Sequence, residues 1–274
     1  MSLRILLVAT RMGIGGAETH VLTLARVLRR RGNHVHILSA GGAYLPALIS
    51  AQVEHTVLPL DKKDIFSVTK SAKAIWQIAT EGRYDIVHAH GRIPQFICGM
   101  LSKRGGFPPF AVTAHGFYDP APPRRAFTLW GRRTIAVSED VKSFIVEKYK
   151  LDPASVEVIT NGVDTDVPPH QPSRRLRIVT ASRLDGDTAL CPTLLCELMP
   201  RICKDHPELE PTLTVVGGGE KLGELREAAR LANSQSPGAV TMAGSVLDMQ
   251  AVLARADIFV GSSRAALEAM AAGV

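Results

Sequence analysis

Residues 4–18 read RILLVATRMGIGGAE, an apolar run that is followed by a glycine-rich loop. The run lacks polar alternation, which is typical of a parallel strand covered on both faces. The next stretch, 17–31, places Val21, Leu24 and Leu28 at three- and four-residue spacing, which predicts an amphipathic helix. Glycines between a strand and a helix let the backbone approach a ligand, and free amides at a helix start favour an anion. The stretch therefore predicts the first strand and helix of an α/β sheet, with a ligand-binding loop between them.

The same alternation of apolar runs and amphipathic stretches continues along the chain, which is the pattern of an α/β protein. Residues 166–175 interrupt it with three prolines, which can extend neither a helix nor a central strand. We therefore predict two tandem Rossmann-like domains with doubly wound parallel sheets, over 1–165 and 176–274, joined by this linker. The predicted strands are 4–10, 34–40, 53–60, 85–90, 110–115, 134–138, 156–161, 176–181, 212–216, 239–243 and 257–261, and the predicted helices include 17–31, 65–80, 190–204, 221–233 and 247–255.

The second predicted domain contains fewer strands than a doubly wound sheet normally has. The chain stops at Ala-Ala-Gly-Val, which resembles a helix end followed by the first residue of another strand. We expect this domain to be incomplete. With the strand order 3-2-1-4-5-6 of such sheets, the last strand of this chain would be left as an unpaired edge.

Composition excludes several classes of protein. The chain has 274 residues, of which 46% are hydrophobic and 21% charged, and no window approaches the length of a membrane span. Four cysteines are too few for a disulfide scaffold and form no C-x-x-C pair, so we expect a reducing, cytoplasmic setting, with the inner face of the membrane as an alternative.

The positive charge is concentrated in the first half of the chain. Residues up to 165 contain 21 Lys and Arg against 13 Asp and Glu, whereas the remainder contains 11 against 13. Clusters such as Arg29–Arg31 fit either an anionic partner or a solvated helix end. No basic and aromatic residues are interleaved, so nucleic-acid binding is not expected.

The loop after the first strand is only a partial dinucleotide-binding fingerprint. Gly13 and Gly15 begin the motif, but its third glycine would stand where the chain has Glu18. The second strand also ends without the acidic residue that binds a ribose. A hydride-transfer enzyme is therefore disfavoured.

Histidines occur at the ends of two predicted strands. His88 and His90 lie on one face of strand 85–90, because side chains alternate along a strand. Zinc sites need three or four ligands, and no third ligand is near in sequence, so hydrogen-bonded histidines are favoured over a metal site. His115 ends strand 110–115, where it either faces a cleft or is a hydrogen-bonded loop histidine.

The loops of the second half carry a cation, glycines and a carboxylate. Arg183 follows strand 176–181, where its guanidinium could bind a phosphate. The pair Asp185 and Asp187 flanks a glycine and indicates a turn more than a metal site. Three glycines, 217–219, follow the next strand, and Glu268 lies about one turn into the last helix, where it could accept hydrogen bonds from a ribose or simply favour the helix start.

Taken together, these motifs resemble the retaining family 4 glycosyltransferases of the GT-B fold. Each is weak alone, and the specificity lies in their order over almost the whole chain. The matching segments are 15–18 (GGAE), 85–90 (DIVHAH), 113–116 (TAHG), 137–139 (VSE), 159–164 (ITNGVD), 182–184 (SRL), 217–220 (GGGE) and 266–271 (ALEAMA).

The resemblance implies a nucleoside-diphosphate sugar bound mainly to the second domain, an acceptor bound to the first, and transfer in the cleft. Its implied catalytic residues are His115, at the transferring sugar, and Arg183, at the departing diphosphate. No metal and no cofactor would be needed. The implied donor contacts are Gly15, Gly16, Asn161, Gly218, Glu220, Ser263 and Glu268, and the implied acceptor contacts are Glu18 and His90.

Two positions depart from the family pattern. A lysine usually follows the arginine by five residues, where this chain has Thr188, and a second glutamate usually stands where it has Val260. The first change removes a cation at the leaving group and the second removes a sugar contact. Ser262, Ser263 and Arg264 could compensate.

The resemblance implies transfer of a hexosyl unit to a glycan or lipid-linked hydroxyl with retention of configuration, in the synthesis of a cell-envelope polysaccharide or glycolipid. Two alternatives remain: a nucleotide-sugar-binding relative with little turnover, and a sugar-nucleotide epimerase on the same fold. The basic first domain also fits peripheral membrane association, with the apolar residues of 96–101, before Lys103 and Arg104, as the suggested contact.

Overall fold

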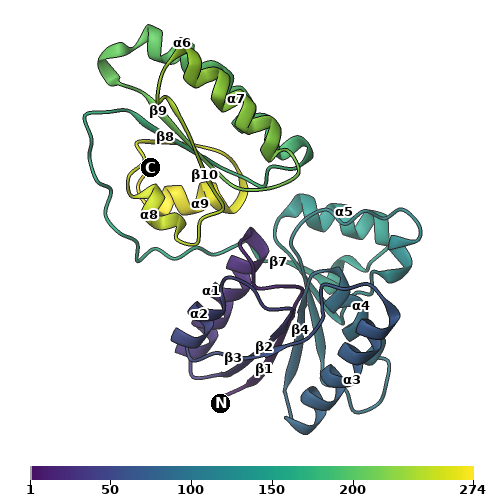
Figure 1. Cartoon of the computed structure of the whole chain (residues 1–274). Coiled ribbons are helices and arrows are strands. Elements are labelled where there is room, and N and C mark those ends of the chain that lie inside the picture. Colours follow the sequence, from purple (N-terminus) through teal and green to yellow (C-terminus); the bar gives the residue numbers. More distant parts are fainter. Residues whose placement is uncertain (1) are drawn as a thin grey trace. The chain divides into compact units, whose positions relative to one another are not determined.

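A computed structural model describes residues 2–274, which divide into two compact units. The first unit ends at Gly162 and the second runs from Val163 to Val274, so the proline-containing segment 166–175 lies at the start of the second unit (Figure 1). Each unit is built on its own parallel sheet.

The sheet of the first unit has seven strands in the order β3-β2-β1-β4-β5-β6-β7. All its pairs are parallel, and the register places Ile5 beside Ile86 and Ala9 beside His90. The chain moves outward from β1 to β3, then crosses to the other side of β1. The strands are β1 (Arg4–Ala9), β2 (His34–Ser39), β3 (Glu54–Val57), β4 (Ile86–His90), β5 (Phe110–Ala114), β6 (Arg133–Ala136) and β7 (Val156–Val158).

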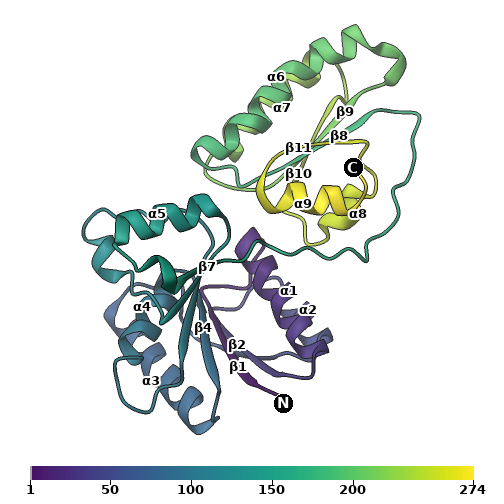
Figure 2. The same cartoon turned by 180° about the vertical axis from the view of Figure 1, so that it is seen from behind.

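Helices cover both faces of this sheet, as Figures 1 and 2 show from opposite sides. Leu6 and Val8 of β1 pack with α3 and α4, whereas Ile5 and Leu7 pack with α1 and α2. Burial on both faces explains why the strand is apolar throughout. The helices are α1 (Gly16–Arg30), α2 (Leu45–Ser50), α3 (Ile65–Glu81), α4 (Arg92–Leu101) and α5 (Glu139–Tyr149), with 3-10 turns at Arg124–Phe127 and Pro153–Ser155.

The suggested membrane contact at 96–101 is wrong. This segment lies within α4, and its residues Ile97, Cys98 and Leu101 are buried in the core beside α3 and the sheet. Phe96 packs against the same cluster. The apolar stripe therefore covers the sheet, because an α/β fold must cover both faces of its strands.

The second unit repeats the doubly wound pattern on four parallel strands in the order β10-β9-β8-β11. Ile178 of β8 packs with α6 and α7, and the next residue, Val179, packs with segments on the opposite face. Within the described residues β11 pairs only with β8, so the predicted edge position is confirmed. The elements are β8 (Arg177–Ala181), α6 (Leu190–Asp205), β9 (Thr212–Val216), α7 (Leu222–Gln235), β10 (Val240–Gly244), α8 (Met249–Leu253), β11 (Ile258–Val260) and α9 (Ser263–Ala271), with 3-10 turns at Gly186–Ala189 and Pro207–Leu209.

Some predicted strands are longer than the observed ones. The predicted strand 53–60 is β3, which ends at Val57, two residues before Pro59, a residue without an amide to donate. The predicted strand 156–161 is β7, which ends at Val158, so Asn161 lies beyond the strand. Within residues 2–274, no helix combines the length and the apolar composition needed to cross a bilayer.

Candidate functional site

The glycine-rich loop of the first unit leads directly into α1. Gly15 is the N-cap, and no side chain among the described residues caps the first amides of the helix. A Cβ atom on Gly15 would lie 2.5 Å from Oε2 of Glu18, so this carboxylate folds back over the loop. Apart from its chain neighbours and the backbone of α1 itself, no described atom lies within 4 Å of a Cβ added to Gly16. Free amides beside a carboxylate suit a ligand rich in hydroxyl groups, which can both accept and donate hydrogen bonds.

Three histidines meet at the carboxyl edge of the first sheet. His90 ends β4, His115 follows β5 directly, and His20 lies in the second turn of α1. Nδ1 of His90 lies 3.0 Å from Nε2 of His115. The ring centroid of His20 lies 5.7 Å from that of His90 and 4.9 Å from that of His115. The sequence predicts His90 and His115 in the site but not His20, which no local pattern marks.

His88 lies beside this cluster on the same face of β4. Its ring centroid lies 4.2 Å from that of His90, as the alternation along the strand predicts. The two histidines are hydrogen-bonded to different partners, because Nε2 of His88 lies 2.8 Å from Oγ1 of Thr113. Nε2 of His90 is buried and has no hydrogen-bond partner among the described residues.

Burial keeps the inner histidines neutral. It lowers the pKa of His88 to about 4, with a further contribution from the charge of His20. Burial also lowers the pKa of His90 well below its usual value, and His88, His115 and His20 add to this effect. A neutral imidazole has one nitrogen that donates a hydrogen bond and one with a free lone pair.

In the second unit, the loop after β8 presents an exposed cation. The side chain of Arg183 is 70% exposed, and its Nε lies 3.8 Å from Oδ2 of Asp185. Thr188, at the position of the family's lysine, donates from Oγ1 to the carbonyl oxygens of Arg183 and Asp185, at 2.5 and 2.7 Å. Thr188 therefore holds the backbone of this loop and supplies no second cation.

The glycines after β9 pack directly on this loop. A Cβ on Gly217 would lie 2.0 Å from the carbonyl oxygen of Ser182, and one on Gly219 would lie 2.3 Å from Oδ1 of Asp185. Backbone bonds join the loops, from the amide of Leu184 to the oxygen of Gly218 at 3.0 Å and from the amide of Lys221 to the oxygen of Leu184 at 2.8 Å. Asp185 thus acts as a turn and loop anchor, as the sequence indicated.

The predicted last helix is α9, and its glutamate is already paired. Arg264 donates from Nε to Oε1 of Glu268 at 2.8 Å, and both side chains are largely buried, at 8% and 14% exposure. Ser263 begins the helix in the left-handed region, with φ of 58°. Arg264, which the sequence analysis considered as a substitute contact, therefore orients the carboxylate of Glu268. Val260, the last residue of β11, packs against the core.

Asn161 and Glu220 complete the set of predicted donor contacts. Asn161 lies beyond β7, and its buried Oδ1 has no partner among the described residues. Glu220 is exposed, and its amide is held by Asp185. Within each unit the predicted residues stand at the carboxyl ends of the strands, with His90 and His115 in contact in the first, and Arg183, Gly218 and Glu220 on two joined loops in the second.

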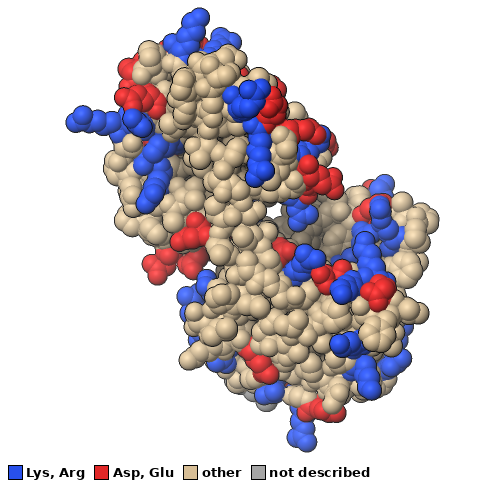
Figure 3. Space-filling view, viewed as in Figure 1, with Lys and Arg blue, Asp and Glu red and all other residues tan. Residues whose placement is uncertain are grey.

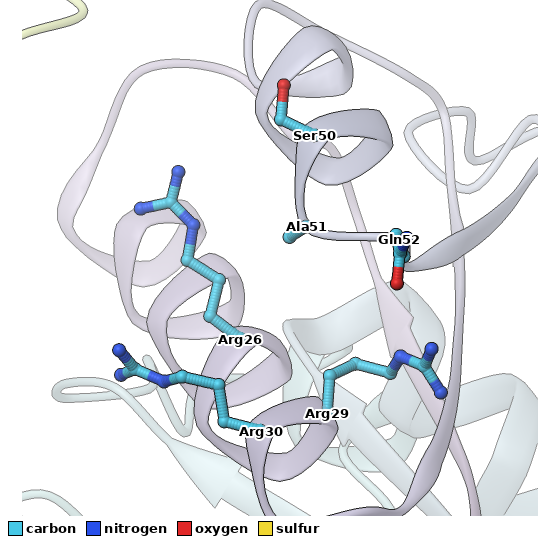
Figure 4. Close-up of a pocket in the computed structure, with 6 residues that line it drawn as sticks. All are labelled: Arg26, Arg29, Arg30, Ser50, Ala51 and Gln52. Atoms are coloured by element: carbon cyan, nitrogen blue, oxygen red, sulfur yellow. The ribbon is translucent and has the colours of Figure 1, made fainter.

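A basic pocket lies elsewhere on the first unit, between the last turns of α1 and α2. Its volume is about 370 Å³, and it is lined by Arg26, Arg29, Arg30, Ser50, Ala51 and Gln52 (Figure 4). Nη1 of Arg29 donates to the carbonyl oxygen of Asn33 at 3.1 Å, which supports the helix-end interpretation of that residue. Figure 3 shows Lys and Arg interspersed with Asp and Glu on the face in view, so no single charge dominates that face.

Comparison with known proteins places both units in known families. Residues 14–167 match the family described as Glycosyltransferase Family 4, and residues 175–274 match Glycosyl transferases group 1. A D-inositol 3-phosphate glycosyltransferase from Frankia alni is 24% identical over 245 residues, 74% of this chain and 60% of that protein. One component of the phosphatidylinositol N-acetylglucosaminyltransferase of Homo sapiens is 26% identical over 276 residues, 91% of this chain and 54% of that protein. The chain spans less than two thirds of the length of these relatives.

Solved structures share the fold. A glycosyltransferase from Rickettsia africae superposes with a TM-score of 0.78 at 20% identity, over 99% of this chain and 78% of that one. Anabaena HepE, solved with UDP and glucose, gives a TM-score of 0.74 at 18% identity, over 99% of this chain and 79% of that one. These likenesses confirm the predicted fold class.

Proposed function

The chain belongs to glycosyltransferase family 4, and from this membership we propose that it transfers a hexosyl unit from a nucleoside-diphosphate sugar to a hydroxyl acceptor, with retention of configuration. The observation that carries the proposal is the position of the predicted residues in both sheets. Ligands of doubly wound sheets bind beyond the carboxyl ends of the strands, where the strand order reverses. That point lies between β1 and β4 in the first unit and between β8 and β11 in the second.

The second unit supplies the groups that a departing diphosphate needs. Arg183 follows β8, and α9 follows β11, the strand that pairs with β8. The guanidinium and the uncapped first amides of α9 therefore come after neighbouring strands. The transition state of glycosyl transfer is oxocarbenium-like, and negative charge grows on the leaving group. A nearby cation and free amides can stabilise that charge without a metal ion. We therefore assign the diphosphate to this unit and propose that no metal or cofactor takes part.

The first unit supplies groups suited to sugar hydroxyls. The uncapped amides at Gly15 and Gly16 lie beside the carboxylate of Glu18, and this carboxylate disfavours an anion in the same place. His90 and His115 lie at the ends of β4 and β5. We propose that His115 contacts the transferring sugar and that Glu18 and His90 contact the acceptor.

We propose a lipid-linked or glycolipid acceptor at an anionic membrane surface. The start of α3 exposes two large apolar side chains, Ile65 at 85% and Phe66 at 76% exposure. Lys62 and Lys63 precede them, and Lys70 lies one turn after Phe66 on the exposed side of the helix. Exposed apolar residues flanked by lysines are typical of an interfacial membrane contact. Two relatives have names that agree with such an acceptor. The human relative is named for phosphatidylinositol, and a galactosyltransferase of Escherichia coli is named for a diphosphoundecaprenol substrate.

We also propose a cytoplasmic location, based on the state of the cysteines. All four cysteines carry free thiols, and Cys98 and Cys196 are buried. Free buried thiols suit a reducing compartment.

A binding protein with little turnover is the second candidate, because Thr188 supplies no cation where the family has lysine. An epimerase is the third, since a Listeria monocytogenes protein named for UDP-N-acetylglucosamine 2-epimerase activity shares the fold with a TM-score of 0.61 at 15% identity. Products distinguish the three functions. A transferase attaches the sugar to an acceptor, an epimerase releases an altered sugar without one, and a binding protein does neither.

The test is a panel of UDP-, GDP- and ADP-sugars added to the chain, with thermal unfolding and product formation as readouts. We expect stabilisation by one nucleotide class, with uridine the favoured base, and a glycosylated lipid product. Proton NMR of the new anomeric centre then reports retention or inversion. Absence of stabilisation by every nucleotide sugar would contradict the proposal.

A further inference from the structure

The histidine cluster of the first unit has a geometry that the proposed transfer does not require. His20, His90 and His115 each offer one ring nitrogen, and these three atoms all lie within 4.8 Å of one another. They come from α1, from the end of β4 and from the residue after β5. Two strands of one sheet and a helix packed on it therefore hold the three rings.

We propose that His20, His90 and His115 form a binding site for a divalent transition-metal ion such as Zn²⁺. Nitrogen ligands about 2.0–2.1 Å from a tetrahedral zinc lie about 3.3 Å from each other. The separation of 3.0 Å between Nδ1 of His90 and Nε2 of His115 is close to this value. His20 is half-buried on a helix, and the site requires a rotation of its side chain that brings its nitrogen closer to the other two.

The chemistry of the ligand set selects the class of metal. Three imidazoles suit Zn²⁺, Co²⁺, Ni²⁺ and Cu²⁺, whereas Mg²⁺ and Ca²⁺ require oxygen ligands. A second observation concerns the same ring: Nε2 of His90 is fully buried but meets no hydrogen-bond partner among residues 2–274, so no described residue satisfies the nitrogen opposite the one that faces His115. Such a nitrogen is unusual in a folded protein, because buried polar atoms are nearly always paired.

The position of the site predicts what the metal does. This step rests on the proposed function, in which His90 and His115 contact the acceptor and the sugar. An imidazole nitrogen bound to a metal cannot bind a hydroxyl at the same time, so the metal and the substrate compete. Zinc would therefore inhibit transfer, and the inhibition would weaken as the acceptor concentration rises.

Direct metal binding is measured on the whole chain by competition of Zn²⁺ with a chromophoric chelator. We expect one equivalent to bind, and His20→Ala to weaken its affinity about tenfold or more. His206→Ala, which removes an exposed histidine of the second unit, serves as the matched control and should leave the affinity unchanged. The absorption spectrum with Co²⁺ separates histidine from cysteine ligands, because a thiolate adds a charge-transfer band. Equal zinc affinity in the wild type and His20→Ala, or a thiolate band, would overturn the site.

The functional consequence has a separate readout. Half inhibition of His20→Ala, measured relative to its own metal-free activity, should require about tenfold more Zn²⁺ than half inhibition of the wild type. Circular dichroism checks that His20→Ala keeps its secondary structure. We expect that it does, because alanine favours a helix at this position. If zinc binds through His20 but no nucleotide sugar is turned over, the metal site stands and the proposed function fails. If transfer occurs and zinc inhibits both proteins equally, the proposed function stands and the metal inference fails.

Discussion

The amide of Glu220 donates a hydrogen bond of 2.6 Å to Oδ1 of Asp185, and this bond joins the loops that follow β9 and β8. Oδ2 of the same carboxylate faces Nε of Arg183 at 3.8 Å. Asp185 therefore connects the glycine loop to the exposed guanidinium. The position of the cation depends on a close approach of two backbones that only glycine permits.

Gly219→Ala should destabilise the second unit and displace the loop that carries Arg183. The φ of Gly219 is 157°, and an added Cβ would meet the carbonyl oxygen of Leu184 at 2.5 Å as well as Asp185. We expect a loss of about 1–3 kcal/mol in the free energy of unfolding. Gly223→Ala is the matched control, because it lies in α7 with no described atom within 4 Å of the new Cβ. It should stabilise by up to about 1 kcal/mol. Urea unfolding followed by circular dichroism tests both variants, and equal effects would refute this account.

Arg183→Ala should reduce sugar transfer about 100-fold, since it removes a cation placed at the leaving group. The side chain is exposed and makes only a long contact with Asp185, so the fold should remain intact. Arg201→Ala removes an exposed arginine of α6 and should leave transfer unchanged. Steady-state kinetics and donor-induced thermal shifts provide the measurement. Full donor affinity in Arg183→Ala would show that the phosphate binds elsewhere.

The first unit should lose stability as the pH falls from 6.5 towards 4. Burial lowers the pKa of His88 from 6.5 to about 4, so below pH 6.5 the unfolded chain binds a proton that the folded unit excludes. Unfolding therefore becomes more favourable with acid, by roughly 3 kcal/mol for this group. Both tryptophans, Trp76 and Trp130, lie in the first unit, so their fluorescence reports its unfolding selectively.

His88→Gln tests the origin of this pH dependence. Glutamine cannot titrate but can still hydrogen-bond Thr113, so the variant should show a shallower loss of stability between pH 6.5 and 4. His206→Gln, in the second unit, should keep the slope of the wild type. An unchanged slope in His88→Gln would assign the effect to other groups.

Between pH 6.5 and 4 the second unit should lose less stability than the first. Hydrogen bonds and charge from Arg177 hold the pKa of Asp257 at about 2. A lowered carboxylate pKa stabilises the fold above the unfolded value of about 3.9, and this contribution is lost only as the pH falls towards 2. Hydrogen exchange of the two units is followed by mass spectrometry across the same pH range. As the pH falls, the first unit should open at a higher pH than the second. Simultaneous opening would contradict the assignment.

Replacing Ile65 and Phe66 together by serine should weaken binding to anionic vesicles. Each apolar side chain contributes up to about 1.5–3 kcal/mol when fully buried, and partial insertion gives a tenfold or larger effect for the pair. Co-sedimentation with phosphatidylcholine vesicles, with and without phosphatidylglycerol, measures the binding. Leu194 and Leu198, two half-exposed residues of α6, provide a control pair for the same substitution. If the wild-type protein does not bind anionic vesicles at low salt, the proposed membrane contact is wrong.

The sequence determined the fold class, the two parallel sheets and the ends of strands where ligands bind. These follow from local composition. An apolar run such as 4–10 is typical of a parallel strand that helices cover on both faces. Ligands of such sheets bind at the loops that follow the strands. It also identified Arg183, His90 and His115 as residues of interest, since each stands directly after or at the end of a strand. The apolar stretch 96–101 was misassigned because an amphipathic stripe looks the same whether it packs on a sheet or on a membrane.

Only the tertiary structure decided which distant side chains meet. His20 joins His90 and His115 because α1 begins just beyond the carboxyl end of β1, so its second turn lies near the edge where β4 and β5 end. Arg264 and Glu268 lie one turn apart in α9, and the structure shows that the two side chains are paired and largely buried. The approach of Gly219 to Asp185 depends on two loops that follow neighbouring strands. The histidine cluster and the contact between the two loops join residues far apart in sequence, and they are fixed by the packing of whole elements, which no short stretch of the chain encodes.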